Sequence, residues 1–176
     1  CLNVSDNTLE NTNLGIKFTN MPTWKPNGME CRVENNILTN SNLSVQDEFL
    51  RYRGFMTVTP EWKSNSSLNI LDNDITSGGI SVYLNQGFPT TIRGNVVTAN
   101  NAPGLDLYIR IHEHVDSQPI QFSLFQIEGN TITNCAIGVQ ESAHNDESTP
   151  QQESDGPIFR HNNIYNNTSN YSANYN

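Results

Sequence analysis

The chain has little charge, few apolar residues and no long hydrophobic run. Only 15% of its 176 residues are charged and 35% are hydrophobic. Acidic residues outnumber basic ones by 18 to 9, giving a net charge of −9. This balance argues against a nucleic acid or an anionic membrane surface as partner, because both attract basic patches. No apolar run approaches the roughly 20 residues that span a bilayer, so we expect no membrane insertion by this segment.

Uncharged polar residues make up much of the remaining sequence, and 27 of them are asparagine. Asparagine is a poor helix former that tolerates left-handed backbone and bonds to neighbouring amides, so the chain is expected to consist of turns and short strands. Six N-glycosylation sequons occur, which permit glycans on a secreted protein. They begin at Asn3, Asn42, Asn65, Asn166, Asn167 and Asn170. No signal peptide is visible, and a mature chain would lack one.

The sequence repeats one phrase six times. In each copy an apolar residue is followed three positions later by asparagine and five positions later by another apolar residue. The copies are Val4-Asn7-Leu9, Val33-Asn36-Leu38, Ile70-Asn73-Ile75, Ile92-Asn95-Val97, Ile127-Asn130-Ile132 and Phe159-Asn162-Ile164. The asparagines recur every 22 to 37 residues, a period typical of solenoids.

The repeats predict β-coils and not helical hairpins, because no copy contains ten residues of 3.6-residue periodicity. Each copy offers a short strand, a polar corner, a second short strand, a second corner and a third strand. We place Asn130 at a left-handed corner and expect such asparagines to form a ladder from coil to coil. Gly138 should open the third strand. The apolar residues around these corners should point into the tube; in the fifth copy they are Ile127, Ile132, Ile137 and Val139.

The phrases IEGNTI (127–132) and IRGNVV (92–97) resemble the repeat of pectate-lyase-like proteins, which are right-handed parallel β-helices. The resemblance covers nearly the whole chain. It implies an all-β solenoid of about six coils with loop insertions, forming one domain over residues 1–176. Since a solenoid needs caps and none is evident at Cys1, we expect the domain to be part of a larger protein.

Three cysteines occur, at Cys1, Cys31 and Cys135. An odd number leaves a free thiol or a partner on another segment. Cys1 and Cys31 precede the first strands of neighbouring coils, so one expectation is a disulfide between them in an oxidising compartment. Reduced thiols are the alternative.

Few residues are candidates for catalysis or metal binding. Asp72 and Asp74 flank a corner asparagine, where two carboxylates could hold calcium or act as an acid–base pair. Members of the resembled family that are lyases use calcium-binding aspartates and an arginine base, and Arg93 and Arg110 are the loose matches here. The structural alternative is that both aspartates simply cap turns.

Two other groups are weaker candidates. His112 and His114 have a spacing that suits two metal ligands on one strand, but no third ligand is evident. Trp24, Tyr52 and Trp62 could provide a sugar-binding platform, or they could pin inserted loops onto the solenoid.

Two functions remain open. The first is a non-catalytic extracellular or cell-surface module, a rigid scaffold in an adhesion or junction protein that presents loops to a protein partner or to flanking domains of the same chain. The second is a polysaccharide-binding or polysaccharide-cleaving protein, a lyase or glycoside hydrolase. The catalytic motifs of pectin hydrolases and alginate epimerases of this fold are missing, which favours the first. No cofactor is expected apart from calcium in the second case.

Overall fold

The computed structural model describes residues 1–18, 30–47, 66–85, 89–99, 101–111, 124–145 and 156–175. These residues form 18 β-strands. The strands are β1 (Leu2–Ser5), β2 (Thr8–Glu10), β3 (Leu14–Phe18), β4 (Glu30–Glu34), β5 (Ile37–Thr39), β6 (Leu43–Asp47), β7 (Ser67–Leu71), β8 (Asp74–Thr76), β9 (Ile80–Asn85), β10 (Thr90–Arg93), β11 (Val96–Thr98), β12 (Pro103–Ile111), β13 (Phe125–Glu128), β14 (Thr131–Thr133), β15 (Ile137–Asn145), β16 (Ile158–Arg160), β17 (Asn163–Tyr165) and β18 (Ser169–Tyr175).

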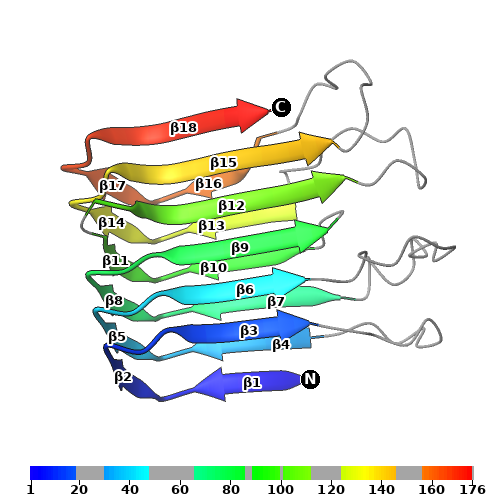
Figure 1. Cartoon of the computed structure of the whole chain (residues 1–176), viewed down its shortest axis with the longest axis vertical. Coiled ribbons are helices and arrows are strands. Elements are labelled where there is room, and N and C mark those ends of the chain that lie inside the picture. Colours follow the sequence, from blue (N-terminus) through cyan, green and yellow to red (C-terminus); the bar gives the residue numbers. More distant parts are fainter. Residues whose placement is uncertain are drawn as a thin grey trace, which may run out of the picture.

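Every third strand belongs to the same sheet, so the chain forms a parallel β-helix of six coils (Figure 1). Sheet A has the order β1-β4-β7-β10-β13-β16, sheet B the order β17-β14-β11-β8-β5-β2, and sheet C the order β18-β15-β12-β9-β6-β3. The two chain termini lie at opposite ends of the stack (Figure 1). Within the described ranges, no helix is long and apolar enough to cross a membrane.

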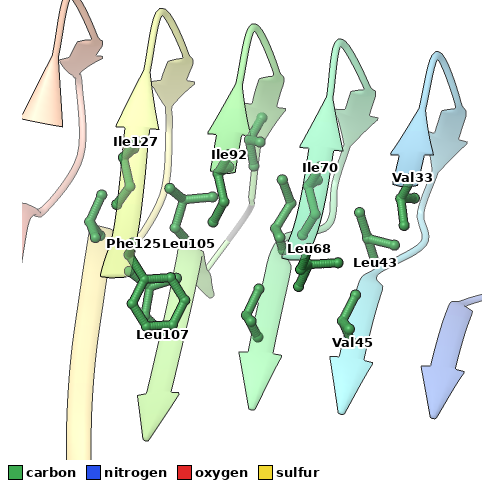
Figure 2. Close-up of a cluster of buried hydrophobic side chains, with 14 of the residues drawn as sticks. Val33, Leu43, Val45, Leu68, Ile70, Ile92, Leu105, Leu107, Phe125 and Ile127 are labelled. Atoms are coloured by element: carbon green, nitrogen blue, oxygen red, sulfur yellow. The ribbon is translucent and has the colours of Figure 1, made fainter. Parts of the chain in front are cut away.

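The strand register confirms the sequence repeat. In sheet A the first apolar residue of each copy pairs with its equivalent in the next coil, from Val4 to Phe159. In sheet B the second apolar residue does the same, from Leu9 to Ile164. In the inner coils these residues are fully buried. Figure 2 shows those of sheet A, Val33, Ile70, Ile92 and Ile127, pointing into the tube. Because the coils stack in parallel register, equivalent residues of the repeat form columns of similar side chains.

The core differs from the prediction in sheet C. Ile127, Ile132 and Val139 are fully buried as expected. Ile137 is only half-buried, because it is the first residue of β15 and directly follows the connection from sheet B. Gly138 lies at the start of the third strand, as predicted.

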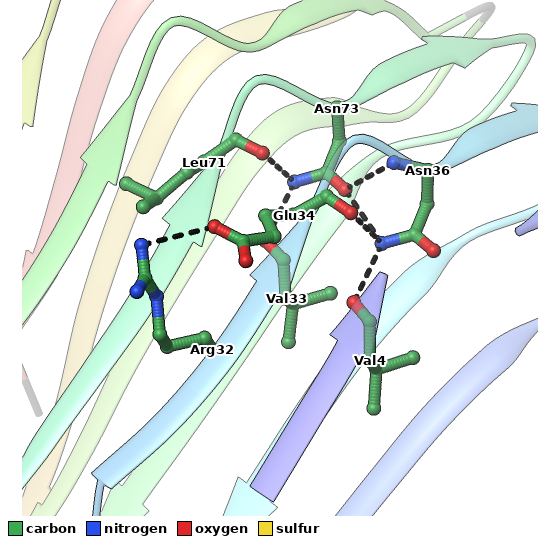
Figure 3. Close-up of polar contacts among 7 residues, drawn as sticks. All are labelled: Val4, Arg32, Val33, Glu34, Asn36, Leu71 and Asn73. Atoms are coloured by element: carbon green, nitrogen blue, oxygen red, sulfur yellow. Dashed lines mark hydrogen bonds and ion pairs between the residues drawn. The ribbon is translucent and has the colours of Figure 1, made fainter. Parts of the chain in front are cut away.

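The repeated asparagines form the expected ladder between sheets A and B (Figure 3). Asn36 donates both its backbone N–H and its side-chain amide to Oδ1 of Asn73, at 3.0 and 2.9 Å. Asn73 repeats both bonds to Asn95, and Asn95 repeats them to Asn130. Each inner amide also donates to a carbonyl of the preceding coil, so a buried polar side chain is satisfied at every step.

The left-handed residue at this corner is not the ladder asparagine but the residue before it. Gly129, with φ 63°, precedes Asn130, and Asp72, with φ 52°, precedes Asn73. The placement of Asn130 itself at a left-handed position was therefore wrong. The turn needs one residue at positive φ, and the asparagine that follows it must aim its side chain inward to bond the ladder. The corner between sheets B and C does use left-handed asparagine, as at Asn40 and Asn134.

Two of the three corners have nearly constant length. Sheet A connects to sheet B through two residues in every coil, for example 129–130, and sheet B connects to sheet C through three or four, for example 134–136. All large differences in length lie where sheet C returns to sheet A. These connections comprise residues 19–29, 48–66, 86–89, 112–124 and 146–157.

We predict that Gly78→Ala destabilises the fold, because a Cβ atom there would lie 1.9 Å from the backbone oxygen of Ser41 in the preceding coil. Backbone cannot rotate away, so the coils must separate, at a cost of about 2–3 kcal/mol in the free energy of unfolding. Gly15→Ala is the matched control, since a Cβ at that position meets nothing within 4 Å. Urea denaturation of both variants tests this prediction, and equal stabilities would contradict the tight approach of coils at Gly78.

Candidate functional site

The outer face of sheet C carries the most distinctive polar and aromatic cluster among the described residues. Alternation in β12 turns Leu105 and Leu107 into the core, where they are fully buried, and leaves Asp106 and Tyr108 half-exposed on the outer face. In β9, Tyr83 is the residue that pairs in register with Tyr108. We call Tyr83, Asp106 and Tyr108 the sheet C patch.

The three side chains contact one another. The hydroxyl of Tyr83 donates a hydrogen bond to Oδ2 of Asp106, at 3.2 Å. The rings of Tyr83 and Tyr108 lie 5.2 Å apart with an interplanar angle of 36°. Cross-strand aromatic pairs of this kind stabilise a sheet and hold their rings in fixed positions. The patch is therefore preorganised.

The pKa values of Asp106 and Tyr83 are both raised in this patch. Burial raises the pKa of the Asp106 carboxyl, although the hydrogen bond from Tyr83 partly opposes this effect. Burial, followed by the nearby charge of Asp106, raises the pKa of Tyr83. Tyr83 thus keeps its proton at neutral pH and serves as a donor, while Asp106 accepts.

The neighbouring strands extend this surface with uncharged polar groups. On β15, Gln140 pairs in register with Asp106, and Ser142 pairs with Tyr108. On β9, Ser81 pairs with Asp106 on the other side. Rings, hydroxyls, an amide and a carboxyl on one flat face are the groups that bind sugar rings and their hydroxyls.

Sequence reasoning missed the sheet C patch, although a signal was present. The third strands of two successive coils read GISVY (79–83) and GLDLY (104–108). Aligning these segments on their glycines places Tyr83 beside Tyr108. Aspartate and tyrosine at alternate positions of the strand LDLYI were the remaining clue.

The structure divides the four acidic and basic candidates between different sheets. Asp72 and Asp74 are exposed on either side of the buried Asn73, and the Asp72 carboxylate lies beside Gly94. Arg93 is exposed on β10 and accepts a backbone hydrogen bond from Asp72 through its carbonyl. The backbone of Arg110 belongs to β12 of sheet C, in register with Asn85 and His144. No three His, Cys, Asp or Glu side chains in the described ranges are grouped to hold a metal.

Several candidates lie outside the described residues. They are the proposed histidine ligands His112 and His114, the aromatic residues Trp24, Tyr52 and Trp62, and the sequon residue Asn65. Their roles stay predictions.

The other sequon asparagines differ in their surroundings. Asn3, Asn166 and Asn170 are exposed. The Asn42 side chain is exposed too, but it accepts a hydrogen bond from the backbone N–H of Gly79. The amide nitrogen of Asn167, the atom that carries a glycan, donates to the carbonyl of Ile132 and to Asn170. Glycosylation of Asn167 would therefore break two internal bonds.

All three cysteines are free thiols in this structure. Cys31 is fully buried opposite Leu2, and burial raises its pKa to about 11. Burial also raises the pKa of Cys135. Cys1 is exposed, one residue before the Leu2 that faces Cys31. The Cys1–Cys31 disulfide stays a prediction, and forming it would require Cys1 to turn toward the core.

One buried polar residue was not anticipated. Glu141 occupies an inward position of β15, between Leu107 of β12 and Ala173 of β18, and is fully buried. The hydroxyl of Tyr171 in the last coil donates a hydrogen bond to its Oε1. This contact ties the sixth coil to the fifth through the core.

Three sheets of six parallel strands with an internal asparagine ladder define the chain as a parallel β-helix protein. Comparison with protein-family models, with curated proteins and with solved structures found no match.

Proposed function

We propose that the chain is a non-catalytic extracellular β-helix module of a cell-surface or adhesion protein, in which a rigid scaffold presents loops to a protein partner. One observation carries this proposal: all large differences in connection length lie at the edge between sheets C and A. The connections from sheet A to sheet B and from sheet B to sheet C keep a nearly constant length, and their residues form hydrogen bonds between successive coils. The scaffold is thus uniform, and variation is concentrated where the ends of the sheet C strands are stacked (Figure 1).

Further support comes from the rest of the molecule. The ladder and the columns of buried residues suit a stiff rod, since each coil is fixed to both neighbours. Exposed sequons at Asn3, Asn166 and Asn170 suit a secreted protein. The resemblance of the repeat to pectate-lyase-like β-helices is compatible with such a role, because one fold hosts many functions.

Loop replacement tests this function. We expect that replacing residues 48–66 or 112–124 by the short connection of residues 86–89 leaves the melting temperature nearly unchanged, because the strands that they join remain stacked. We expect the same change to abolish retention of the fluorescently labelled chain on intact epithelial cell layers. Thr91→Ala, on the outer face of sheet A, is the control and should be retained like the parent. Retention of every shortened variant would reject loop presentation.

The extracellular location has its own test. Expressed through the secretory pathway, the chain should lose mass on treatment with an N-glycosidase, and Asn3→Gln should remove part of that loss. A secreted chain with no glycan would contradict the proposal.

A second candidate function is polysaccharide binding, and the sheet C patch is the observation that favours it. Glycoside hydrolysis generally needs two carboxyl groups around the scissile bond. The described patch contributes one, Asp106, so binding is better supported than cleavage.

We predict that Tyr108→Ala and Asp106→Asn each weaken binding to an immobilised polysaccharide panel of polygalacturonate, alginate and chitin. Stacking and charged hydrogen bonds contribute about 1–3 kcal/mol each, so the expected loss is on the order of tenfold or more. Affinity electrophoresis measures this effect, with Thr91→Ala again as control. No binding by the parent chain, or equal binding by all variants, would exclude the patch as a sugar site.

A further inference from the structure

A half-buried carboxylate on the outer face of sheet C has no cation beside it in the described part of the chain. Asp106 forms no ion pair there, and its Oδ2 accepts a hydrogen bond from Tyr83. The other oxygen, Oδ1, has no donor among the described residues and is open to solvent. Burial raises the pKa of this carboxyl, which shows that the charged form lacks full solvation. A cation in contact would compensate for that loss.

Two aromatic rings stand next to this carboxylate. The Tyr83 ring carries the hydroxyl that bonds to Asp106, and the Tyr108 ring lies 5.2 Å from the Tyr83 ring, at an interplanar angle of 36°. The negative face of an aromatic ring attracts a cation, so the rings and the carboxylate favour the same kind of ligand. All three residues keep part of their surface exposed, so a side chain from outside can reach them.

The charges around Asp106 leave this position to an external cation. The outward column to which Asp106 belongs contains no other charged residue, its members being Gly15, Ser44, Ser81, Asp106, Gln140 and Ser172. The neighbouring column contains Lys17, but β6 separates its strand β3 from the strand β9 that carries Tyr83. The carboxylate is therefore the local charge that a ligand meets.

This arrangement suits a guanidinium group better than an ammonium group. A guanidinium group is planar, so it stacks on an aromatic ring and also donates parallel N–H bonds to a carboxylate. An ammonium group is a compact and strongly hydrated charge that gains less from flat rings. Among protein side chains, arginine is the ligand with this chemistry.

The patch lies close to the edge at which we expect the loops to be presented. Tyr83 precedes the end of β9 by two residues, and Tyr108 precedes the end of β12 by three. These two strands are neighbours in the stack (Figure 1), and residues 86–89 and 112–124 follow them. A protein partner that contacts these connections therefore also reaches the patch.

We propose that the sheet C patch binds an arginine side chain of the protein partner, with the guanidinium group bonded to Asp106 and stacked on the tyrosine rings. This inference rests on the scaffold function proposed above and names the chemistry by which the partner is recognised. It assigns the patch to a protein and not to a polysaccharide. An uncharged sugar would leave the Asp106 carboxylate without a cation, whereas a guanidinium group neutralises it.

A peptide titration tests this chemistry on the purified 176-residue chain. The probe is acetyl-Gly-Arg-Gly-amide, and the ring proton signals of Tyr83 and Tyr108 report binding by nuclear magnetic resonance. We expect the arginine peptide to shift these signals, and the shift to decrease with added salt because salt screens the charge of the carboxylate. The same peptide with citrulline in place of arginine keeps the shape without the charge and should cause no shift. Equal shifts with both peptides, or none with either, would overturn the proposal.

Variants of the patch separate the contribution of the charge from that of the ring. Asp106→Asn preserves the shape of the side chain and should lower the affinity for the arginine peptide on the order of tenfold, because the charged hydrogen bonds are lost. Tyr108→Leu keeps an apolar side chain and should lower it about threefold. Glu10→Gln, which removes an exposed charge from sheet B, is the control and should bind like the parent. Parental affinity in Asp106→Asn would contradict the proposed contact.

Cell retention distinguishes this inference from the scaffold function. We expect Asp106→Asn to be retained less than the parent on epithelial cell layers, as the loop-shortened variants are. Loss of retention in the loop-shortened variants together with full retention of Asp106→Asn would reject the arginine contact and leave the scaffold function standing. A parent chain that is not retained would reject the scaffold function, whereas the peptide titration decides whether the patch binds a guanidinium group. Polysaccharide binding without any shift by the arginine peptide would assign the patch to sugars and overturn the inference.

Discussion

Ile132→Asp should unfold the protein or come close to it. Ile132 is fully buried in sheet B, stacked between Val97 and Ile164. An aspartate there would place an unpaired carboxylate among aliphatic side chains, with an expected cost of about 5 kcal/mol. That is a large part of the 5–15 kcal/mol of stability typical of a domain. Urea denaturation followed by circular dichroism measures the change.

The control is Thr131→Asp, one residue earlier in the same strand. Thr131 lies on the outer face of β14, half-exposed, so its replacement should cost about 1 kcal/mol or less. The pair of variants differs only in the face of the sheet that carries the charge. A well-folded Ile132→Asp protein would contradict the placement of this repeat position in the core.

Asn95→Leu should be the second most damaging change, although it preserves the branching and the number of heavy atoms of the side chain. Asn95 is fully buried, and its Oδ1 accepts from the backbone N–H and the amide of Asn73. Its own amide donates to the carbonyls of Ile70 and Arg93 and to Asn130. Leucine leaves these buried partners unsatisfied, so we expect a loss of about 3–5 kcal/mol in the free energy of unfolding.

Asn7→Leu is the matched control at an exposed rung of the same ladder. Within the described residues, the amide of Asn7 donates to the carbonyl of Ser5 and to Asn36. Its loss should cost about 1 kcal/mol, because water replaces the missing partners. Chemical denaturation of both variants compares the two positions. Equal costs would mean that the asparagines act as turn residues and that the continuous ladder contributes little.

Much of the fold could be predicted from the sequence, because a solenoid repeats one local structure along the chain. Each coil pairs with the next one along the sequence, so finding the phrase around Asn36, Asn73 and Asn95 also identifies the neighbours in space. The six copies, the inward direction of their apolar residues and the ladder all follow from this regularity, and the register confirms them.

The site was not found from the repeat phrase, because that phrase describes inward residues only. Asp72 and Asp74 are candidates because they flank one corner asparagine, whereas the sheet C patch joins Tyr83 to Asp106 across two successive coils. That contact involves the outward residues of β9 and β12, whose register pairs Ser81 with Asp106 and Tyr83 with Tyr108. The left-handed residue was expected at Asn130 but is Gly129, one residue earlier. The side chain of Asn130 must point inward to join the ladder, and this requirement is seen only in the structure of the turn.

The repeat pattern is enough to establish a β-helix of about six coils, since hydrophobic burial and asparagine hydrogen bonding act in the same way in each repeat. Two other features depend on the tertiary structure. It brings Tyr83, Asp106 and Tyr108 onto one outer face, and it buries Glu141 in the core beside Tyr171. Each of these depends on which residue of one coil lies over which residue of the next, and that alignment is fixed by packing across the whole stack.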